Sequence, residues 1–391
     1  MPIYKESVQL HEQLGGKLEV IPKIKIHNRH DLSLAYTPGV ARVCEEIAKD
    51  PEKAFKLTIK KNTVAVVSDG SAVLGLGNIG ALASIPVMEG KAVLFKEYAG
   101  IDAFPICITS QNTIELISII KNIAPVFAGI NLEDIASPRC FEIERALQGL
   151  GIPVFHDDQH GTAIVVLAAL INGAKVAGKK LSDMTIVVNG CGAAGTAITE
   201  LILTMGHDPL LPEPVKDILV CDATGILNED RQDMANSAEK SRLAMKTNRH
   251  GRSGTLTDAL EGADVFIGVS VANVVTAEMI RKMNDKSIVL AMANPIPEIM
   301  PDEARAGGAF IVGTGRSDFP NQVNNVLAFP GVFRGAIDAR AETITKNMKI
   351  AAALALADAL PNPSVDEIIP SVLDKSIAYK VAAAVAKAWK K

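Results

Sequence analysis

Short runs of β-branched and aliphatic residues alternate with longer amphipathic stretches along most of the chain. In the first part this pattern predicts a helix at 112–122 and strands at 63–68, 92–97, 103–109 and 126–130. A long apolar helix is expected at 161–178. After it, strands are predicted at 185–188, 217–221, 264–269, 287–291 and 309–312. Strands that alternate with helices are typical of an α/β protein, in which helices cover a parallel sheet.

The length of the chain predicts two domains. A chain of 391 residues exceeds what one ordinary hydrophobic core supports. We place the boundary at the start of the long apolar helix. Residues 1–160 are then an N-terminal α/β domain, and residues 161–391 are a doubly wound domain of the Rossmann type that ends in a helical tail.

Two segments fit the glycine pattern G-x-G-x-x-G, at residues 75–80 and 190–195. The pattern binds a dinucleotide when its first glycine directly follows a strand and its last opens a helix, because the helix N–H groups then face the pyrophosphate. Only the second segment meets this condition, so we assign the cofactor to it. The candidate contacts are Gly190, Gly192, Ala193, Ala194 and Gly195.

An acidic residue at the end of the next strand is expected to bind the adenosine ribose. Asp222 has this position for the second loop, while Glu97 is a rival partner for the first. A carboxylate at Asp222 favours NAD, because it repels the 2′-phosphate of NADP. A nearby cation would compensate, and the sequence offers three candidates, namely Arg231, Lys246 and Arg249.

Composition excludes several classes of partner. The formal net charge is −4 and no long run of Lys and Arg occurs, which argues against nucleic acid. The five cysteines form no C-x-x-C pair, which suits the reduced cytoplasm. The N-terminus has no apolar signal core, and the longest apolar stretch, near residues 162–171, is far short of a membrane span. We therefore expect a cytoplasmic protein with no membrane partner.

Two acidic pairs follow predicted strands. Glu133 and Asp134 come after one strand, and Asp157 and Asp158 come after another. Open α/β sheets bind their ligands at the carboxyl ends of strands, and carboxylate oxygens suit Mg²⁺ or Mn²⁺. The alternative is that these residues only form turns and caps, with Asp158 capping the helix that begins near residue 161.

Other chemistries lack a pattern. His156 and His160 flank the second acidic pair, but they have no H-E-x-x-H spacing and no third nitrogen or sulfur ligand nearby, so a zinc site is not expected. The chain also lacks the G-x-S-x-G elbow of acyl transfer and the phosphate loop of ATP-binding proteins.

Several long strings resemble those of malic enzymes, in the order in which that family has them. The resemblance covers about residues 30–335, and its strings are AYTPGVA, SDGSAVLGLGNIG, EGKAVLFKEYAGIDAFPI, INLEDI, FHDDQHGTA, ANPIPE and NNVLAFPG. It implies an N-terminal domain for substrate and metal and a homodimeric enzyme. The implied reaction oxidises L-malate to pyruvate and CO₂ with NAD or NADP and with Mg²⁺ or Mn²⁺. Decarboxylation of oxaloacetate is an implied side activity.

The resemblance also implies roles for individual residues. Tyr36 corresponds to the general acid and Lys91 to the general base. The implied metal ligands are Glu133, Asp134 and Asp158. The implied substrate contacts are Asn294 and Asn325, and Asn294 is also an implied cofactor contact. Asp157 and Asn324 are implied to orient these groups.

One position departs from the family pattern. Longer eukaryotic relatives have a carboxylate-binding Arg where this chain has Ala72. The substitutes are Ser71, backbone N–H groups of the 75–80 turn, or an Arg from elsewhere.

Three rival functions remain. These are a malolactic enzyme that returns the hydride to give lactate, an oxaloacetate decarboxylase without net redox change, and an inactive nucleotide sensor.

Overall fold

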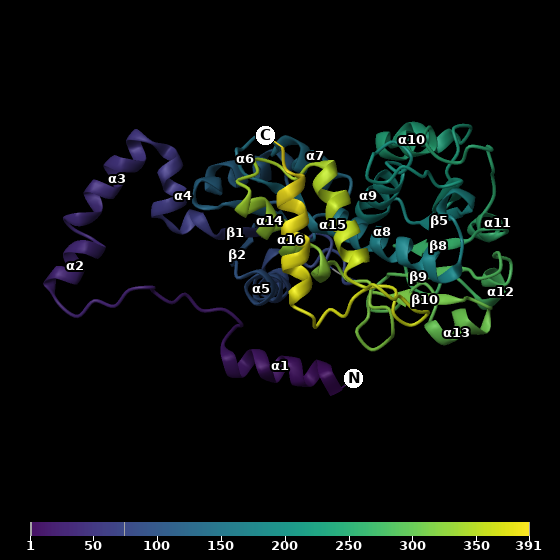
Figure 1. The fold of residues 1–391 in the computed structure, drawn as a ribbon, viewed down its shortest axis with the longest axis horizontal. Helices are drawn as coiled ribbons and strands as arrows, with labels where there is room; N and C mark the ends of the chain where they lie inside the picture. Colours follow the sequence, from purple (N-terminus) through teal and green to yellow (C-terminus); the bar gives the residue numbers. More distant parts are fainter. Residues whose placement is uncertain (1, 74, 391) are drawn as a thin grey trace.

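Two β-sheets, one parallel and one mostly parallel, are joined by one long buried helix (Figure 1). This computed structural model describes residues 2–73 and 75–390. The first sheet has the order β2-β1-β3-β4, and all its strands run parallel. Its strands are β1 (Thr63–Ser68), β2 (Asp102–Cys107), β3 (Gly129–Leu132) and β4 (Val154–His156), and its helices are α5 (Gly80–Ala99), α6 (Thr113–Ile123) and α7 (Arg139–Ala146).

The second sheet has the order β10-β9-β8-β5-β6-β7, in which β7 alone runs antiparallel among the described strands. Its strands are β5 (Thr185–Asn189), β6 (Asp217–Asp222), β7 (Gly225–Ile226), β8 (Val265–Gly268), β9 (Ile288–Ala291) and β10 (Ile311–Thr314). Its helices are α9 (Ala193–Ile202), α10 (Ala238–Ala244), α11 (Leu256–Leu260), α12 (Ala277–Ile280) and α13 (Pro301–Ala306). The strand order reverses at β5, which is where doubly wound sheets bind nucleotides. The predicted α/β fold with a Rossmann-type second domain is confirmed.

Helix α8 (Asp157–Ala177) links the two sheets. It begins at Asp157 rather than near residue 161, so Asp157 and Asp158 lie in its first turn instead of before it. Its length and composition would suffice for a membrane span, contrary to our expectation of a much shorter apolar stretch. However, 78% of its most apolar window is buried inside the protein, which is the position of a core helix.

The strand predicted at 92–97 is wrong, because these residues lie in α5. A short apolar run fits a buried strand and part of a buried helix equally well, so periodicity alone does not separate the two. Met88, Ala92 and Phe95 are buried in α5. The Phe95 ring packs edge-on against Phe329 of α14 (Phe329–Asp338), with 4.8 Å between the ring centroids.

The C-terminal helices return to the first domain (Figure 1). They are α14 (Phe329–Asp338), α15 (Lys346–Asp358) and α16 (Ser376–Ala388). The buried amide of Asn172 in α8 donates to the carbonyls of Ala357 and Ile368, which ties this tail to the central helix. The tail also fixes the short turn η6 (Asn325–Leu327), which precedes α14.

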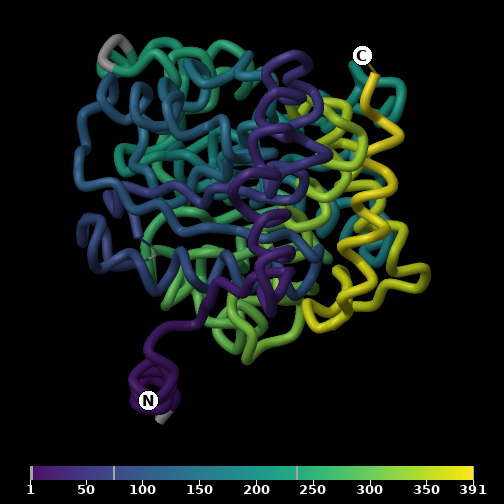
Figure 2. The backbone as a smooth tube through the Cα atoms, turned by 90° about the vertical axis from the view of Figure 1, so that its left-hand side faces the viewer, coloured from purple at the N-terminus to yellow at the C-terminus, as the bar shows by residue number. Residues whose placement is uncertain are grey.

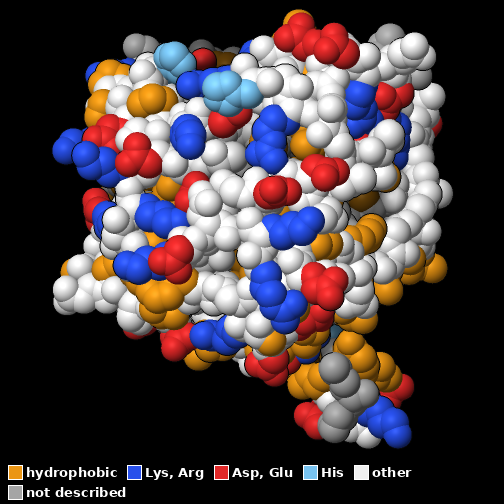
Figure 3. All heavy atoms as spheres, turned by 90° about the vertical axis from the view of Figure 1, so that its right-hand side faces the viewer, with side chains coloured by type: hydrophobic (Ala, Val, Ile, Leu, Met, Phe, Trp, Pro, Cys, Tyr) orange, Lys and Arg blue, Asp and Glu red, His pale blue; other side chains and the backbone are white. Residues whose placement is uncertain are grey.

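The N-terminal segment forms an extended arm that stands away from the two sheets (Figures 1 and 2). It contains α1 (Pro2–Leu14), α2 (Arg29–Ala35) and α3 (Gly39–Lys49), and α2 and α3 have no buried residue. Its root consists of η1 (Pro51–Lys53), α4 (Ala54–Leu57) and η2 (Ile59–Lys61). Figure 3 shows α1 projecting from the lower edge, below a face on which Lys and Arg are mixed with Asp and Glu.

Candidate functional site

A cavity of about 740 Å³ lies between the two domains, where the carboxyl ends of both sheets meet. Many of the residues predicted from the sequence line it. From the first domain these are Lys91, Glu133 and Asp158, and from the second domain and the tail they are Gly192, Ala193, Ala194, Asn294, Asn324 and Asn325. The fold therefore joins the predicted metal, substrate and cofactor residues in one place.

Three carboxylates form a cluster on the wall of this cavity. Glu133, Asp134 and Asp158 each offer one oxygen, and these oxygens lie within 4.8 Å of one another. The chain leaves β3 in a tight turn in which Asp134 adopts a left-handed conformation, with φ 53°. The Asp134 N–H donates to Asp158 Oδ2 at 2.8 Å, which fixes the two loops to each other.

The electrostatics of the cluster suit a divalent cation. Burial, followed by the neighbouring carboxylates, raises the pKa of Asp134 to about 8 and that of Glu133 well above its usual value. The buried Asp134 Oδ2 has no hydrogen-bond partner. Lys91 is the one cationic side chain among the described residues that line the cavity. A hard cation with oxygen ligands would supply the missing positive charge and the missing partner.

Lys91 lies in α5 and is 8% exposed, so its amine is largely shielded from solvent. Its amine contacts Asp157 and lies 3.1 Å from Glu133 Oε1. Burial alone would lower the pKa of Lys91, but the charges of Asp157 and Glu133 outweigh it and raise that pKa. Burial raises the pKa of Asp157 to about 6, against the opposing effect of Lys91. The neighbouring carboxylates therefore favour the protonated form of the amine.

The two histidines beside this cluster, His156 and His160, do not line the cavity. His160 Nε2 lies 2.9 Å from Glu144 Oε1, and His156 is fully buried beneath the site. Burial would raise the pKa of Glu144, but the His160 ring beside it lowers that pKa to about 2. No sequence pattern marked Glu144, because it comes from α7 and meets α8 only in the folded chain.

Ser71 lies behind the cavity. Its hydroxyl donates to Asp69 and accepts from Arg139 and from the Ala136 N–H, so its oxygen already has three partners. Arg139 is also bound to Asp69, at 2.8 Å, and does not line the cavity. Ser71, the turn at residues 75–80 and an Arg from elsewhere were the groups expected to replace the carboxylate-binding Arg. Of these, the turn that begins at Gly75 lines the cavity, as Ala72 does.

The second glycine loop has the geometry that dinucleotide binding requires. It follows β5 directly and opens α9. A Cβ on Gly195 would lie 1.7 Å from the Gly190 carbonyl oxygen, so the turn closes only with glycine there. A Cβ on Gly192 would meet nothing within 4 Å, which leaves open space for a phosphate. Glu97, the rival acid of the first loop, pairs instead with Lys375 on the surface.

Asp222 ends β6 as expected, but its carboxylate is held by two cations. Arg231 makes two hydrogen bonds to it, at 2.9 and 3.0 Å, and Lys240 adds one at 2.6 Å. These bonds outweigh the opposing effect of burial and lower the pKa of Asp222 to about 2. Of the three proposed compensating cations, only Arg231 makes a bond to Asp222, and Lys240 was not anticipated.

Tyr36 lies outside the cavity. It ends α2 on the extended arm and is 68% exposed. Within a single chain, Tyr36 is therefore not among the residues that line the site.

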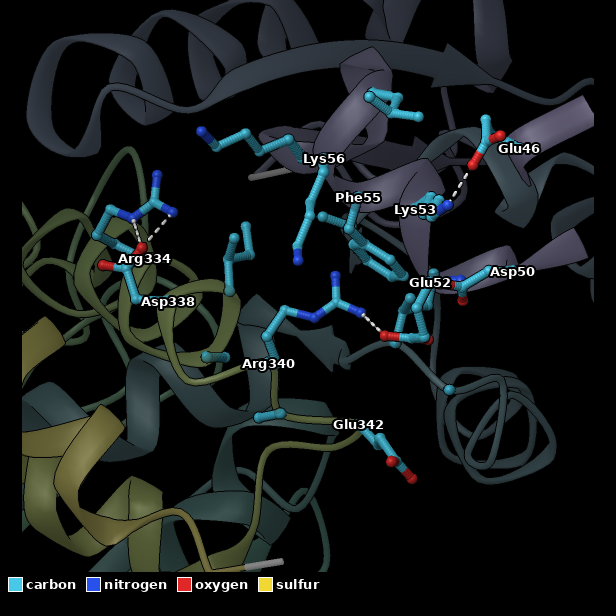
Figure 4. Close-up of a pocket in the computed structure, with 18 residues that line it drawn as sticks. Glu46, Asp50, Glu52, Lys53, Phe55, Lys56, Arg334, Asp338, Arg340 and Glu342 are labelled. Carbon is cyan, nitrogen blue, oxygen red and sulfur yellow. Dashed lines mark hydrogen bonds and ion pairs between the residues drawn. The ribbon is translucent and has the colours of Figure 1, made fainter. Parts of the chain in front are cut away.

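A second hollow, of about 870 Å³, lies between the root of the arm and the end of α14 (Figure 4). Its charged side chains pair with each other, as Lys53 does with Glu46 and Arg340 with Glu52. Its described lining contains no group of three converging carboxylates, no buried amine and no glycine loop. Although larger, it lacks the chemistry that the interdomain cavity has.

Two family models match the chain over nearly its whole length. The N-terminal domain of malic enzyme matches residues 15–148, and the NAD-binding domain of malic enzyme matches residues 159–389. The chain belongs to the malic enzyme family. This assignment agrees with the two sheets and with the interdomain position of the site.

Known malic enzymes are similar to this chain over most of their length. The bifunctional malic/malolactic enzyme of Bacillus subtilis (strain 168) is 52% identical, over 99% of this chain and 93% of its own. The NAD-dependent malic enzyme of Geobacillus stearothermophilus is 53% identical, over 96% and 77%. A crystal structure of the NAD-dependent malic enzyme from Thermotoga maritima superimposes with a TM-score of 0.92 at 49% identity, over 97% of this chain and 98% of that one.

Proposed function

We propose that this protein oxidises L-malate with NAD⁺ or NADP⁺ and a divalent cation and releases CO₂, which leaves pyruvate. One observation carries the proposal. The same interdomain cavity is lined by the buried amine of Lys91, by two carboxylates of the three-carboxylate cluster, Glu133 and Asp158, and by the dinucleotide loop. We expect the enzyme to act in the cytoplasm on this small substrate, without a nucleic-acid or membrane partner.

The proposed base is Lys91. Its amine takes the proton of the malate C2 hydroxyl while the hydride leaves C2 for the nicotinamide. Asp157 contacts this amine, so it orients the base and stabilises its protonated form. The amine becomes a base only when the charges of Glu133 and its neighbours are offset. Deprotonation of Lys91 is thereby linked to occupation of the carboxylate cluster.

The proposed metal ligands are Glu133, Asp134 and Asp158. Mg²⁺ or Mn²⁺ held there would act as a Lewis acid toward substrate oxygen and stabilise the negative charge that loss of CO₂ leaves. The Asn131 amide donates to Glu133 Oε2 at 2.8 Å and so orients that ligand. The same groups would suffice for decarboxylation of added oxaloacetate, which needs no hydride acceptor.

Neutral groups are proposed to hold the carboxylates of malate. Asn294 and Asn325 line the cavity from the second domain and from η6. Asn324 caps η6, where its side-chain oxygen accepts from the Val326 N–H at 3.0 Å, and thereby orients Asn325. Ser71 acts indirectly in this proposal, by fixing the chain beside Ala72.

Tyr36 is proposed as the general acid, acting in the site of a second copy of the chain. The arm that carries it exposes many large apolar side chains, among them Ile3, Val8, Val20, Ile21 and Leu34. An exposed apolar surface of this extent is unfavourable in water and is typical of an interface. We therefore propose a homodimer in which the arm crosses to the partner and brings Tyr36 to protonate C3 of the enol.

Mixed dimers test this arrangement. Lys91→Ala and Tyr36→Phe subunits would each be inactive alone. If Tyr36 acts across the dimer, mixing the two variants restores activity, because one site of the heterodimer then contains an intact Lys91 and an intact Tyr36. If Tyr36 acts within its own chain, every site in the mixture has lost either Lys91 or Tyr36, and the mixture stays inactive after subunit exchange has been verified by mass.

A malolactic reaction is a second candidate, favoured by the likeness to the bifunctional enzyme of Bacillus subtilis. It would return the hydride to pyruvate before release. Incubation with L-malate, Mn²⁺ and NAD⁺, followed by chromatography of the products, distinguishes the two. Pyruvate equal to the reduced cofactor supports the malic enzyme reaction, whereas lactate without net reduced cofactor supports the malolactic one. If neither pyruvate nor lactate forms, the result favours the inactive nucleotide sensor.

A further inference from the structure

Glu298 is a buried carboxylate to which the proposed reaction assigns no role. It follows the loop that carries Asn294 and is 0% exposed. Its Oε1 accepts from the Ser270 N–H at 2.7 Å, and its Oε2 accepts from the Ala293 N–H at 3.0 Å. The Ser270 hydroxyl lies 3.3 Å from Oε1. Glu298 thus fixes two loops, one after β8 and one after β9, at the carboxyl edge of the second sheet.

The surroundings of Glu298 match its ionised form. Both backbone contacts are N–H donors, which a carboxylate accepts and a carboxylic O–H cannot use. The Asn189 amide donates to Ser270 Oγ at 2.8 Å, so the hydroxyl hydrogen of Ser270 is free to point at Glu298. Burial raises the pKa of Glu298, while the N–H groups of Ser270 and Ala293 oppose this effect. Among the described ion pairs, none includes Glu298.

The position of this charge is next to the expected place of the nicotinamide. Ser270, Ala293 and Asn294 line the cavity between the glycine loop and Lys91. A dinucleotide whose pyrophosphate lies on Gly192 must extend its nicotinamide along this wall to reach the base. The Glu298 carboxyl group lies directly behind the wall, against β8, where a Cβ on Gly268 would be 2.5 Å from its carbon.

We propose that the Glu298 carboxylate stabilises the oxidised nicotinamide relative to the reduced one. The oxidised ring carries a positive charge, and the hydride that it receives from malate, with two electrons, makes it neutral. A fixed negative charge behind the ring attracts the first form and leaves the second almost unaffected. Glu298 is therefore a positioning residue with an electrostatic effect, which favours binding of the oxidised cofactor and release of the reduced one. This inference rests on the proposed function.

The effect is large enough to measure. For two unit charges about 10 Å apart, Coulomb's law with an effective dielectric constant of about 20 gives roughly a tenfold change in affinity. The other charges that face the cavity, on Lys91, Glu133 and Asp158, belong to the opposite domain and stay the same when Glu298 is changed.

Binding of the two cofactor forms to Glu298→Gln tests the proposal. The dissociation constant of the reduced cofactor is measured by its fluorescence, and that of the oxidised cofactor by displacement. We expect the preference for the oxidised form, as a ratio of the two constants, to fall by about tenfold. A purely structural role would weaken both forms alike and leave the ratio unchanged, which would overturn the proposal. Ser270→Ala, which removes a hydroxyl but keeps the charge, is the matched control and should keep the wild-type ratio.

A measurement on the unaltered protein covers the case in which Glu298→Gln does not fold. A dinucleotide analogue with an uncharged benzamide ring in place of nicotinamide has the shape of the oxidised cofactor without its charge. We expect the protein to bind the oxidised cofactor roughly tenfold more tightly than this analogue, and equal affinity would overturn the proposal. If the unaltered protein binds neither form of the cofactor, the proposed function fails instead.

Discussion

Binding of the metal is predicted to depend steeply on pH. In the metal-free protein the pKa of Asp134 is raised to about 8 by burial and by the adjacent carboxylates. Below that pH, Asp134 is protonated, and a cation must displace the proton in order to bind. Each displaced proton changes the dissociation constant tenfold per pH unit. With a pKa of about 8, half of Asp134 is already ionised at pH 8, so from pH 8 to pH 6 we expect Mn²⁺ binding to weaken by about 50-fold, and by more if Glu133 also releases a proton.

Calorimetric titration of the protein with Mn²⁺ measures this effect directly. Titrations at one pH in two buffers of different ionisation enthalpy count the protons released, and we expect about one or more at pH 7. Asp134→Asn is the control, because it removes the titrating group and should give weaker but flatter pH dependence. A dissociation constant that changes less than about threefold between pH 8 and pH 6, with no proton released, would refute the reasoning.

The same raised pKa predicts how stability changes with pH. Between the ordinary pKa of 3.8 and about 8, the folded metal-free protein binds more protons at Asp134 than the unfolded chain does. Stability of the metal-free protein therefore decreases as the pH rises through this window, as far as this group contributes. Mn²⁺ should reverse the loss, so the rise in Tm on adding Mn²⁺ should be larger at pH 8 than at pH 6.

Three further predictions concern single residues. Lys91→Ala should abolish malate oxidation and leave binding of the reduced cofactor, measured by fluorescence, within about twofold; full turnover would remove Lys91 as the base. Lys240→Ala removes one of the two cations that offset the charge of Asp222, and the 2′-phosphate of NADP⁺ needs that compensation. The change should therefore lower kcat/KM for NADP⁺ by about tenfold or more, as for a charged hydrogen bond, and for NAD⁺ much less; equal losses would contradict this compensating role. Asn172→Ala leaves two buried carbonyls of the tail without a donor and should lower the free energy of unfolding by about 3 kcal/mol; an unchanged urea midpoint would contradict the importance of this link.

Local sequence signals predicted the parts of the site that one segment builds. The loop from Gly190 to Gly195 follows its strand and opens its helix, because the glycine spacing itself determines that turn. The acidic pairs were placed at the ends of β3 and β4, because parallel strands bring their carboxyl ends to one edge.

Signals that depend on tertiary contacts were missed. The run at 92–97 predicts a strand but lies in α5, because a run this short does not distinguish a strand from part of a buried helix. Lys240 reaches Asp222 from another helix, and Glu298 reaches Ser270 from another loop, with no spacing that marks either contact. The exposed arm was not predicted either, because local apolar spacing does not tell whether a helix packs within its own chain or stays exposed. The boundary at residue 160 falls inside α8 and stays a prediction.

The central claim is that one interdomain cavity holds the base, the metal and the cofactor for oxidation of malate. Its most direct test follows absorbance at 340 nm with L-malate and Mn²⁺, with NAD⁺ and NADP⁺ in parallel reactions, before and after addition of EDTA. We predict that reduced cofactor appears in amounts equal to pyruvate, that EDTA stops the reaction, and that excess Mn²⁺ restores it. Formation of reduced cofactor that is insensitive to EDTA, or no formation with either cofactor, would contradict the account.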